Sequence, residues 1–222
     1  MDSAGTDLAR ELLADTGWVE RTRGFARSLR RSTDPGDGLL LVGTRTQEPW
    51  HLAAHLDDEA RCCGIPTLSP TLVRWAPPTG APAHLAISLE RLEHTRRGET
   101  VVVVAPDDPG EQLLERLADA RRTGITLLTL DDGDPEWDDL AHERLVVPAA
   151  GTAVVPAVPL SLGRGGLGLD VVPAVSFDTV QHLVSAAAGE SPLVLTGRAS
   201  RRGFRDRLGR LLDTLQGPTI PD

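Results

Sequence analysis

Two histidines spaced one helical turn apart are the most specific chemical feature of this sequence. His51 and His55 stand in the run HLAAH, within a stretch from Pro49 to Cys63 whose apolar residues recur at helical spacing. Residues four apart share one face of a helix, so the two imidazoles could bind a metal ion together or handle a proton. Such pairs are also common on solvated helix faces, and the sequence leaves both interpretations open.

A second candidate site follows the first expected strand. The segment Gly43–Gln47 reads GTRTQ and comes directly after the short apolar run Leu39–Val42. The hydroxyls of Thr44 and Thr46, together with the guanidinium of Arg45, could hold an anion at the start of the next helix. A plain turn without a ligand explains the same residues.

The composition excludes several other chemistries. The chain of 222 residues has a net charge of −9 and contains neither lysine nor tyrosine. A Walker-type phosphate lysine, a Schiff-base lysine and a tyrosine general acid are therefore ruled out. Cys62 and Cys63 are adjacent, so they cannot tie distant parts of the chain together as a pair, and we expect reduced packing thiols in a cytoplasmic protein. No apolar run is long enough to span a membrane.

Short apolar runs alternate with amphipathic stretches along most of the chain. The expected strands are Leu39–Val42, Leu72–Trp75, Thr100–Ala105, Ile125–Leu130 and Leu145–Val147. The expected helical segments are Asp7–Arg31, Pro49–Cys63, His84–Arg97, Glu111–Arg122, a short turn at Asp138–Glu143, Ser176–Ala188 and Phe204–Leu215. This alternation predicts an α/β fold, a three-layer α/β/α sandwich around a mainly parallel five-stranded, doubly wound sheet.

The domain organisation follows from the same pattern. Residues 1–190 are expected to form one α/β domain, in which the segment 149–175, rich in proline, glycine and alanine, is a long loop. Residues 191–222 form a C-terminal extension, and its helix 203–215 carries leucines on one face among arginines. That helix could dock on a protein partner or pack on its own domain. Separate acidic and basic stretches favour self-association as a homodimer or larger, while nucleic acid is not expected.

The stretch from Glu99 to Pro148 resembles the second half of a sugar isomerase (SIS) domain. In that family a strand enters a loop, a helix ends in A-x-x-x-G, and a further strand precedes the dipeptide L-A. Ala120–Gly124 and the Leu140-Ala141 pair occupy those places here. The resemblance implies a doubly wound fold and a site for a sugar phosphate.

The phosphate loop of that family is rewritten in this chain. The family sequence S-x-S-G-x-T is replaced at Ala105–Glu111 by APDDPGE, without a serine or a threonine. Asp107 and Asp108 stand where the resemblance would place a phosphate dianion, and carboxylates repel it by about 1–4 kcal/mol at moderate dielectric. We therefore expect a degenerate member of the family.

The sedoheptulose-7-phosphate isomerase branch offers a closer parallel to the histidine pair. That branch has H-x-A-A-E-L where this chain has HLAAHL, so His51 would match its histidine and His55 would replace its glutamate. The branch completes its site from the last helix with glutamine and histidine, and this chain offers Asp178, Gln181 and His182 there. The resemblance makes His51, His55 and His182 candidate catalytic residues, or ligands of a divalent metal. The sequence otherwise predicts no cofactor.

Three functions remain open at this point. The first is a ligand-binding or regulatory module that has lost isomerase chemistry and holds a small phosphorylated ligand near Gly43–Gln47. The second is a metal-assisted phosphosugar isomerase that uses the three histidines. The third is a structural oligomerisation protein that assembles through the C-terminal helix.

Overall fold

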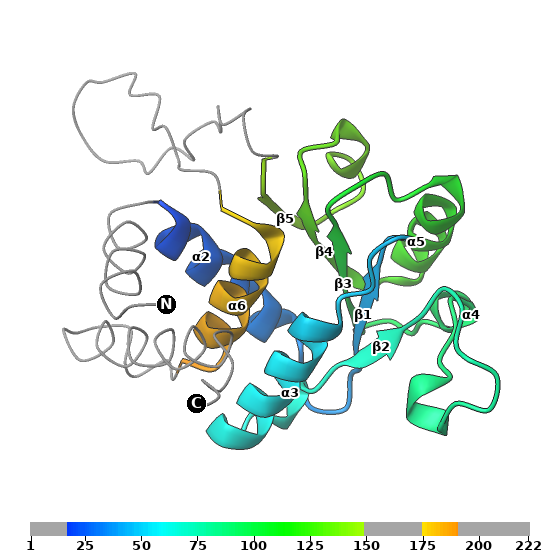
Figure 1. Cartoon of the computed structure of the whole chain (residues 1–222), viewed down its shortest axis with the longest axis horizontal. Helices are drawn as coiled ribbons and strands as arrows, with labels where there is room; N and C mark the ends of the chain where they lie inside the picture. Colours follow the sequence, from blue (N-terminus) through cyan, green and yellow to red (C-terminus); the bar gives the residue numbers. More distant parts are fainter. Residues whose placement is uncertain (1–16, 149–174, 191–222) are drawn as a thin grey trace, which may run out of the picture.

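Five parallel strands form one sheet in the order β2-β1-β3-β4-β5 (Figure 1). The structure is a computed structural model, and it describes residues 17–148 and 175–190. The strands are β1 (Leu39–Gly43), β2 (Thr71–Val73), β3 (Thr100–Ala105), β4 (Thr126–Asp131) and β5 (Glu143–Val146). The α-helices are α2 (Trp18–Ser32), α3 (Trp50–Cys63), α4 (Glu90–Glu93), α5 (Glu111–Thr123) and α6 (Phe177–Ala188). Short 3₁₀ turns are η1 (Pro66–Leu68), η2 (Ala83–Leu85) and η3 (Pro135–Trp137).

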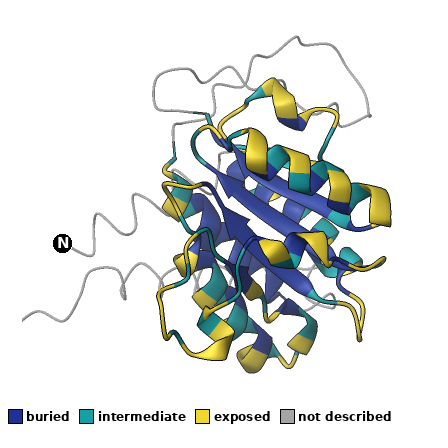
Figure 2. Cartoon of the chain, turned by 90° about the vertical axis from the view of Figure 1, so that its right-hand side faces the viewer, coloured by how far each residue is buried: buried dark blue, intermediate teal, exposed yellow. Residues whose placement is uncertain are grey.

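The sheet is covered on both faces, which confirms the predicted three-layer α/β fold. Apolar side chains of α2, α3 and α6 pack on one face, and those of α4 and α5 pack on the other. The central strands β1 and β3 are buried along their whole length, as Figure 2 shows in dark blue. Burial on both faces explains why their sequences are uninterrupted apolar runs and not alternating patterns.

The ends of three predicted helices are confirmed by their caps. Gly64 ends α3 and Gly124 ends α5, each with a left-handed backbone that glycine adopts at little cost. Ser176 begins α6, where its hydroxyl accepts a hydrogen bond from the backbone N–H of Thr179. Asp178 lies in the first turn of α6.

The predicted helix His84–Arg97 is wrong. The structure has the single turn η2 and the four-residue α4 in its place. The backbone N–H of Arg74, just after β2, donates to the carbonyl of Ile87, and Ser88 forms a bridge with Arg74. A chain that pairs with the end of a strand cannot also make helical hydrogen bonds, so tertiary pairing overrides the helical spacing.

One further predicted element differs from the structure in its position. The short helical turn expected at Asp138–Glu143 forms earlier, as η3, and its last residue already belongs to β5. The side chain of Asp134 accepts from the backbone N–H of Glu136 and so starts η3 upstream. Three predicted segments lie outside the described residues: the expected loop 149–175 except for its last residue, the extension 191–222 with its helix 203–215, and residues 7–16 of the expected helix 7–31.

The order of the strands places a crossover point between β1 and β3. The chain leaves β1 through α3 on one face and leaves β3 through α5 on the other face. In doubly wound sheets, ligands usually bind at the carboxyl ends of two adjacent parallel strands whose following connections go to opposite faces of the sheet. The segment Gly43–Gln47 begins at this point, and α3 with its two histidines starts directly after it.

Candidate functional site

Three histidines from two helices meet between α3 and α6. The ring centroid of His182 lies 4.4 Å from that of His55 and 6.3 Å from that of His51. One ring nitrogen of each histidine can be chosen so that all three lie within 4.8 Å of one another. The structure therefore brings together the three residues that the sequence pointed to as catalytic residues or metal ligands.

The packing of α6 against α3 produces this arrangement. His51 and His55 are four residues apart and so share the face of α3 that meets α6. Further along the two helices, Glu59 of α3 lies so close to Gly189 that a side chain on Gly189 would overlap its carboxylate. The contacts at His182 and at Gly189 show that α3 and α6 run side by side in the same direction, as Figure 1 also shows in cyan and gold.

The three imidazoles differ in exposure. His51 is exposed, His55 is half-buried, and His182 is only 3% exposed. Within the described chain, neither ring nitrogen of His182 has a hydrogen-bond partner. A buried polar group without a partner costs about 1–3 kcal/mol. A ligand that accepts the lone pair of His182 would remove the part of this cost that belongs to one ring nitrogen.

The electrostatics keep the buried imidazole neutral. Burial, together with the neighbouring His55 and His51 and against the effect of Asp178, lowers the pKa of His182 to about 4. Burial also lowers the pKa of His55, with His51 acting in the same direction and Asp58 against it. A neutral imidazole has a free nitrogen lone pair, so both side chains can bind a metal ion at neutral pH.

The geometry fits a transition-metal ion. Imidazole nitrogens suit zinc and its neighbours in the first transition row, and a tetrahedral ion bound at about 2.0–2.1 Å needs nitrogens about 3.4 Å apart. The three nitrogens lie within 4.8 Å of one another, so small rotations of the side chains would bring them to that spacing. Three protein ligands leave one position of such an ion open, as in catalytic zinc sites.

The predicted anion segment Gly43–Gln47 is engaged by a carboxylate. The hydroxyl of Thr44 is buried and lies 3.2 Å from the hydroxyl of Thr46, which in turn donates to Asp107 in the loop after β3. Asp107 thus takes the hydroxyl that would otherwise face a ligand anion, and its charge would repel a phosphate. Arg45 and Gln47 are exposed.

The two cysteines lie at the far end of α3 from the exposed His51. Cys63 is half-buried and its thiol donates to the carboxylate of Glu59 at 3.2 Å. Cys62 is exposed, so the expectation of a packing thiol is wrong for this residue. It is wrong because the apolar face of α3 is set by Leu52, Leu56 and Ala60, and Cys62 does not share that face.

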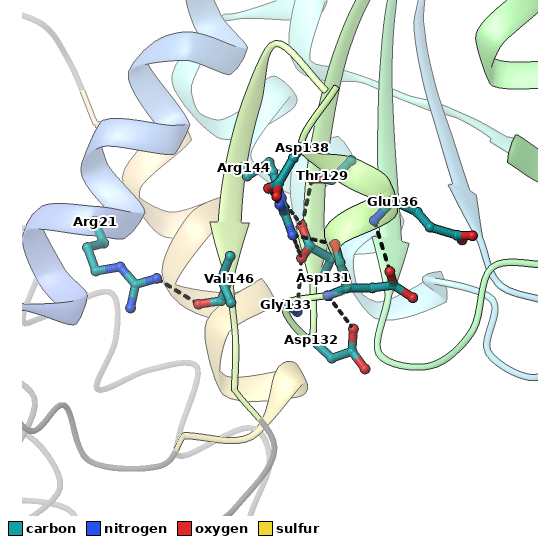
Figure 3. Close-up of polar contacts among 10 residues, drawn as sticks. Arg21, Thr129, Asp131, Asp132, Gly133, Glu136, Asp138, Arg144 and Val146 are labelled. Atoms are coloured by element: carbon teal, nitrogen blue, oxygen red, sulfur yellow. Dashed lines mark hydrogen bonds and ion pairs between the residues drawn. The ribbon is translucent and has the colours of Figure 1, made fainter. Parts of the chain in front are cut away.

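Sequence reasoning missed a buried ion pair at the carboxyl end of β4. Figure 3 shows Asp131, which is fully buried, accepting hydrogen bonds from Arg144 at 2.5 and 3.2 Å. The hydroxyl of Thr129 and the backbone N–H of Gly133 also donate to it, at 2.8 and 3.0 Å. Burial opposes the charge of Arg144, but the hydrogen bonds and charges of Asp131 and Asp138 raise its pKa. An isolated aspartate after a strand gives no spacing pattern, so the sequence held no signal for this pair.

Comparisons with known proteins find similarity among solved structures. No protein-family model matches the chain, and no curated protein matches it. The sugar isomerase domain of the RpiR transcription factor from Sphaerobacter thermophilus is similar, with a TM-score of 0.47 and 15% identity over 92% of this chain and 91% of that one. A protein from Salmonella typhimurium LT2 described as sugar-binding gives a TM-score of 0.46 and 14% identity over 90% of this chain, which spans 54% of that protein's length.

The assignment to the sedoheptulose-7-phosphate isomerase branch stays a prediction. Among the described residues, none of the helices has the length and apolar character that crossing a membrane requires.

Proposed function

We propose that this chain is a metal-dependent ligand-binding module. His51, His55 and His182 hold a divalent transition-metal ion, and its open position binds an oxygen atom of a small ligand. The observation that carries the proposal is the convergence of three imidazoles. One of them, the ring of His182, is buried and has no hydrogen-bond partner within the described chain. Structural histidines in protein interiors are normally hydrogen-bonded, whereas a metal ligand keeps a nitrogen free for the ion.

Binding without isomerisation is the activity that the loops favour. The segment after β3 has lost the hydroxyls of the family's phosphate loop, and Asp107 takes the hydroxyl of Thr46 at the crossover point. The metal centre would then be the main contact for the ligand. The sequence resemblance of Glu99–Pro148 to a SIS domain makes a sugar or a sugar phosphate the first ligand class to test.

A metal-assisted isomerase is the second candidate function. Isomerisation of a sugar requires a base within hydrogen-bonding reach of the carbon-bound proton. Burial lowers the pKa of His55, which is therefore neutral at pH 7. It would act as this base in place of binding the ion, because both roles use the same nitrogen lone pair. Turnover of a phosphosugar by the metal-loaded protein, and its loss on chelation, would favour this function over binding alone.

Metal titration tests the proposal directly. The full-length protein is stripped with a chelator and titrated with Co²⁺ or Zn²⁺ by calorimetry, absorption spectroscopy and thermal unfolding. We expect one ion per chain, visible absorption bands of a Co²⁺ site with nitrogen ligands, and a rise in Tm on loading. His182→Ala and His55→Ala should abolish the bands, whereas the matched control His84→Ala, at an exposed position, should keep them. A wild-type protein that shows no saturable binding of either ion would refute the proposal.

The ligand is tested on the loaded protein. Neutral sugars, amino sugars and sugar phosphates are compared by thermal shift with and without Zn²⁺. Stabilisation by any of them that requires the metal supports a ligand-binding module. Stabilisation that is equal in the stripped protein would place the ligand elsewhere on the molecule.

A further inference from the structure

Asp178 lies one helical turn before His182 on α6, at the exposed end of the histidine cluster. Because α3 and α6 run in the same direction, one turn back on each helix leads from the His55–His182 contact to His51 and Asp178. Each helix thus contributes two residues four positions apart, His51 and His55 from α3 and Asp178 and His182 from α6. The first residue of each pair is exposed, and His182 is buried.

A carboxylate near the cluster would offset part of the charge of a divalent ion. Three neutral imidazoles leave both charges of a divalent ion uncompensated. Asp58 and Glu59 act electrostatically on His55, and Asp178 acts on His182. Asp58 forms an ion pair with Arg61 at 3.4 Å.

Of the other two carboxylates, Glu59 accepts from the thiol of Cys63 and packs over Gly189, at the end of α6 away from Asp178. Asp178 instead accepts a hydrogen bond from the neutral amide of Gln181 at 3.3 Å. The amide of Gln181 does not neutralise the negative charge of Asp178. Like the exposed His51, Asp178 lies at the exposed end of the cluster.

Gln181 provides a second observation that points to a ligand here. Its side chain is 2% exposed, and the amide oxygen has no hydrogen-bond partner within the described chain. The amide nitrogen is used by Asp178, which orients the amide and leaves the oxygen as the free atom. Two consecutive residues of α6, Gln181 and His182, are thus nearly fully buried and carry polar atoms without partners.

We infer that Asp178 is the carboxylate of this metal centre. It balances the charge of the ion held by the three histidines, contacts that ion through a water molecule, and fixes the amide of Gln181. It is a positioning residue, since the histidines remain the ligands. The inference rests on the proposed function, because it requires that the histidines bind a metal.

The variant Asp178→Asn tests this inference, because it removes the charge and keeps the size of the side chain. Glu111→Gln is the matched control, since Glu111 is likewise an exposed acid in the first turn of a helix, α5, so the control measures any general effect on helix dipoles. The Kd for Zn²⁺ is measured by competition with a chelating dye, and the Co²⁺ absorption spectrum is recorded for each variant. Circular dichroism and Tm of the stripped proteins check the fold.

We expect Asp178→Asn to weaken Zn²⁺ binding by about 10- to 100-fold, the usual effect of losing a group that supports metal ligands. The Tm of the stripped variant should stay close to that of wild type, and Glu111→Gln should leave the Kd within about twofold of it, as expected for a distant surface site. An unchanged Kd in Asp178→Asn would overturn the inference while wild-type binding leaves the metal centre in place. Absence of binding in wild type would overturn both.

Discussion

The imidazole rings of His55 and His182 lie edge to face across the interface of α3 and α6, with their centroids 4.4 Å apart and their planes at 68°. Two rings at this distance cannot both be protonated without strong repulsion, and the more buried one has a pKa of about 4. The contact therefore consists of neutral imidazoles at pH 7, and acid should disrupt it.

Stability should fall on acidification through the titration of His182. Its pKa is lowered in the folded protein, so between about pH 6.5 and 4 the unfolded chain binds a proton that the folded chain does not. The free energy of unfolding therefore falls as the pH drops through this window, by up to about 3 kcal/mol from this residue alone. Urea unfolding from pH 7.5 to 4 measures the effect.

The control for this pH dependence is His182→Leu, which keeps a side chain of similar bulk without a titrating group. The unfolding free energy of wild type minus that of this variant should fall steadily below pH 6.5. A parallel pH dependence of the two proteins would show that other groups cause the acid sensitivity.

Asp107→Ser should restore affinity for phosphate at the crossover point. The substitution removes the charge that engages Thr46 and supplies a hydroxyl donor between the ends of β1 and β3. We expect at least about fivefold tighter binding of inorganic phosphate, because removing one like charge at close range is worth about 1 kcal/mol or more. Phosphate titration followed by NMR measures this, and Asp119→Asn, at an exposed site on α5, is the control. Equal affinity in both variants would show that Asp107 does not set the charge preference of the site.

Asp131→Ala should destabilise the fold without affecting metal binding. The change leaves Arg144, which is largely buried, without its main partner, and breaking a buried ion pair costs about 3–5 kcal/mol. Chemical denaturation measures the loss, and Asp139→Asn, on the exposed surface nearby, should change stability by less than about 0.5 kcal/mol. The Zn²⁺ affinity of the folded fraction should equal that of wild type. The helix α3 connects β1 and β2, whereas β4 and β5 lie at the other edge of the sheet. A loss of metal affinity would mean that the two networks are coupled.

The sheet could be predicted from the sequence because its strands are buried on both faces. Runs such as Thr100–Ala105 admit few other interpretations once Gly98 and Pro106 bound them, and all the paired strands are parallel as expected. The helix His84–Arg97 was predicted wrongly because leucine spacing carries no information on the hydrogen bond between Arg74 and Ile87. That bond depends on where β2 lies in space.

Part of the candidate site could also be predicted from the sequence, and part of it could not. The relation between His51 and His55 is local, so helical spacing alone puts both side chains on one face. Their meeting with His182 depends on the packing of α6, and only the resemblance to a known family suggested it. The contact of Thr46 with Asp107 joins residues from two different loops, and composition gave no hint that a carboxylate would take a hydroxyl of the expected anion segment.

The position of the three histidines has a consequence for assembly of the fold. More than half of the chain separates His55 from His182, so an ion bound by both would close a very long loop and act as a removable cross-link. Such a link lowers the entropy of the unfolded chain, and the free energy of ion binding becomes free energy of folding. The supply of metal would then govern how firmly α6 is held against α3, and with it the completeness of one whole layer of the sandwich.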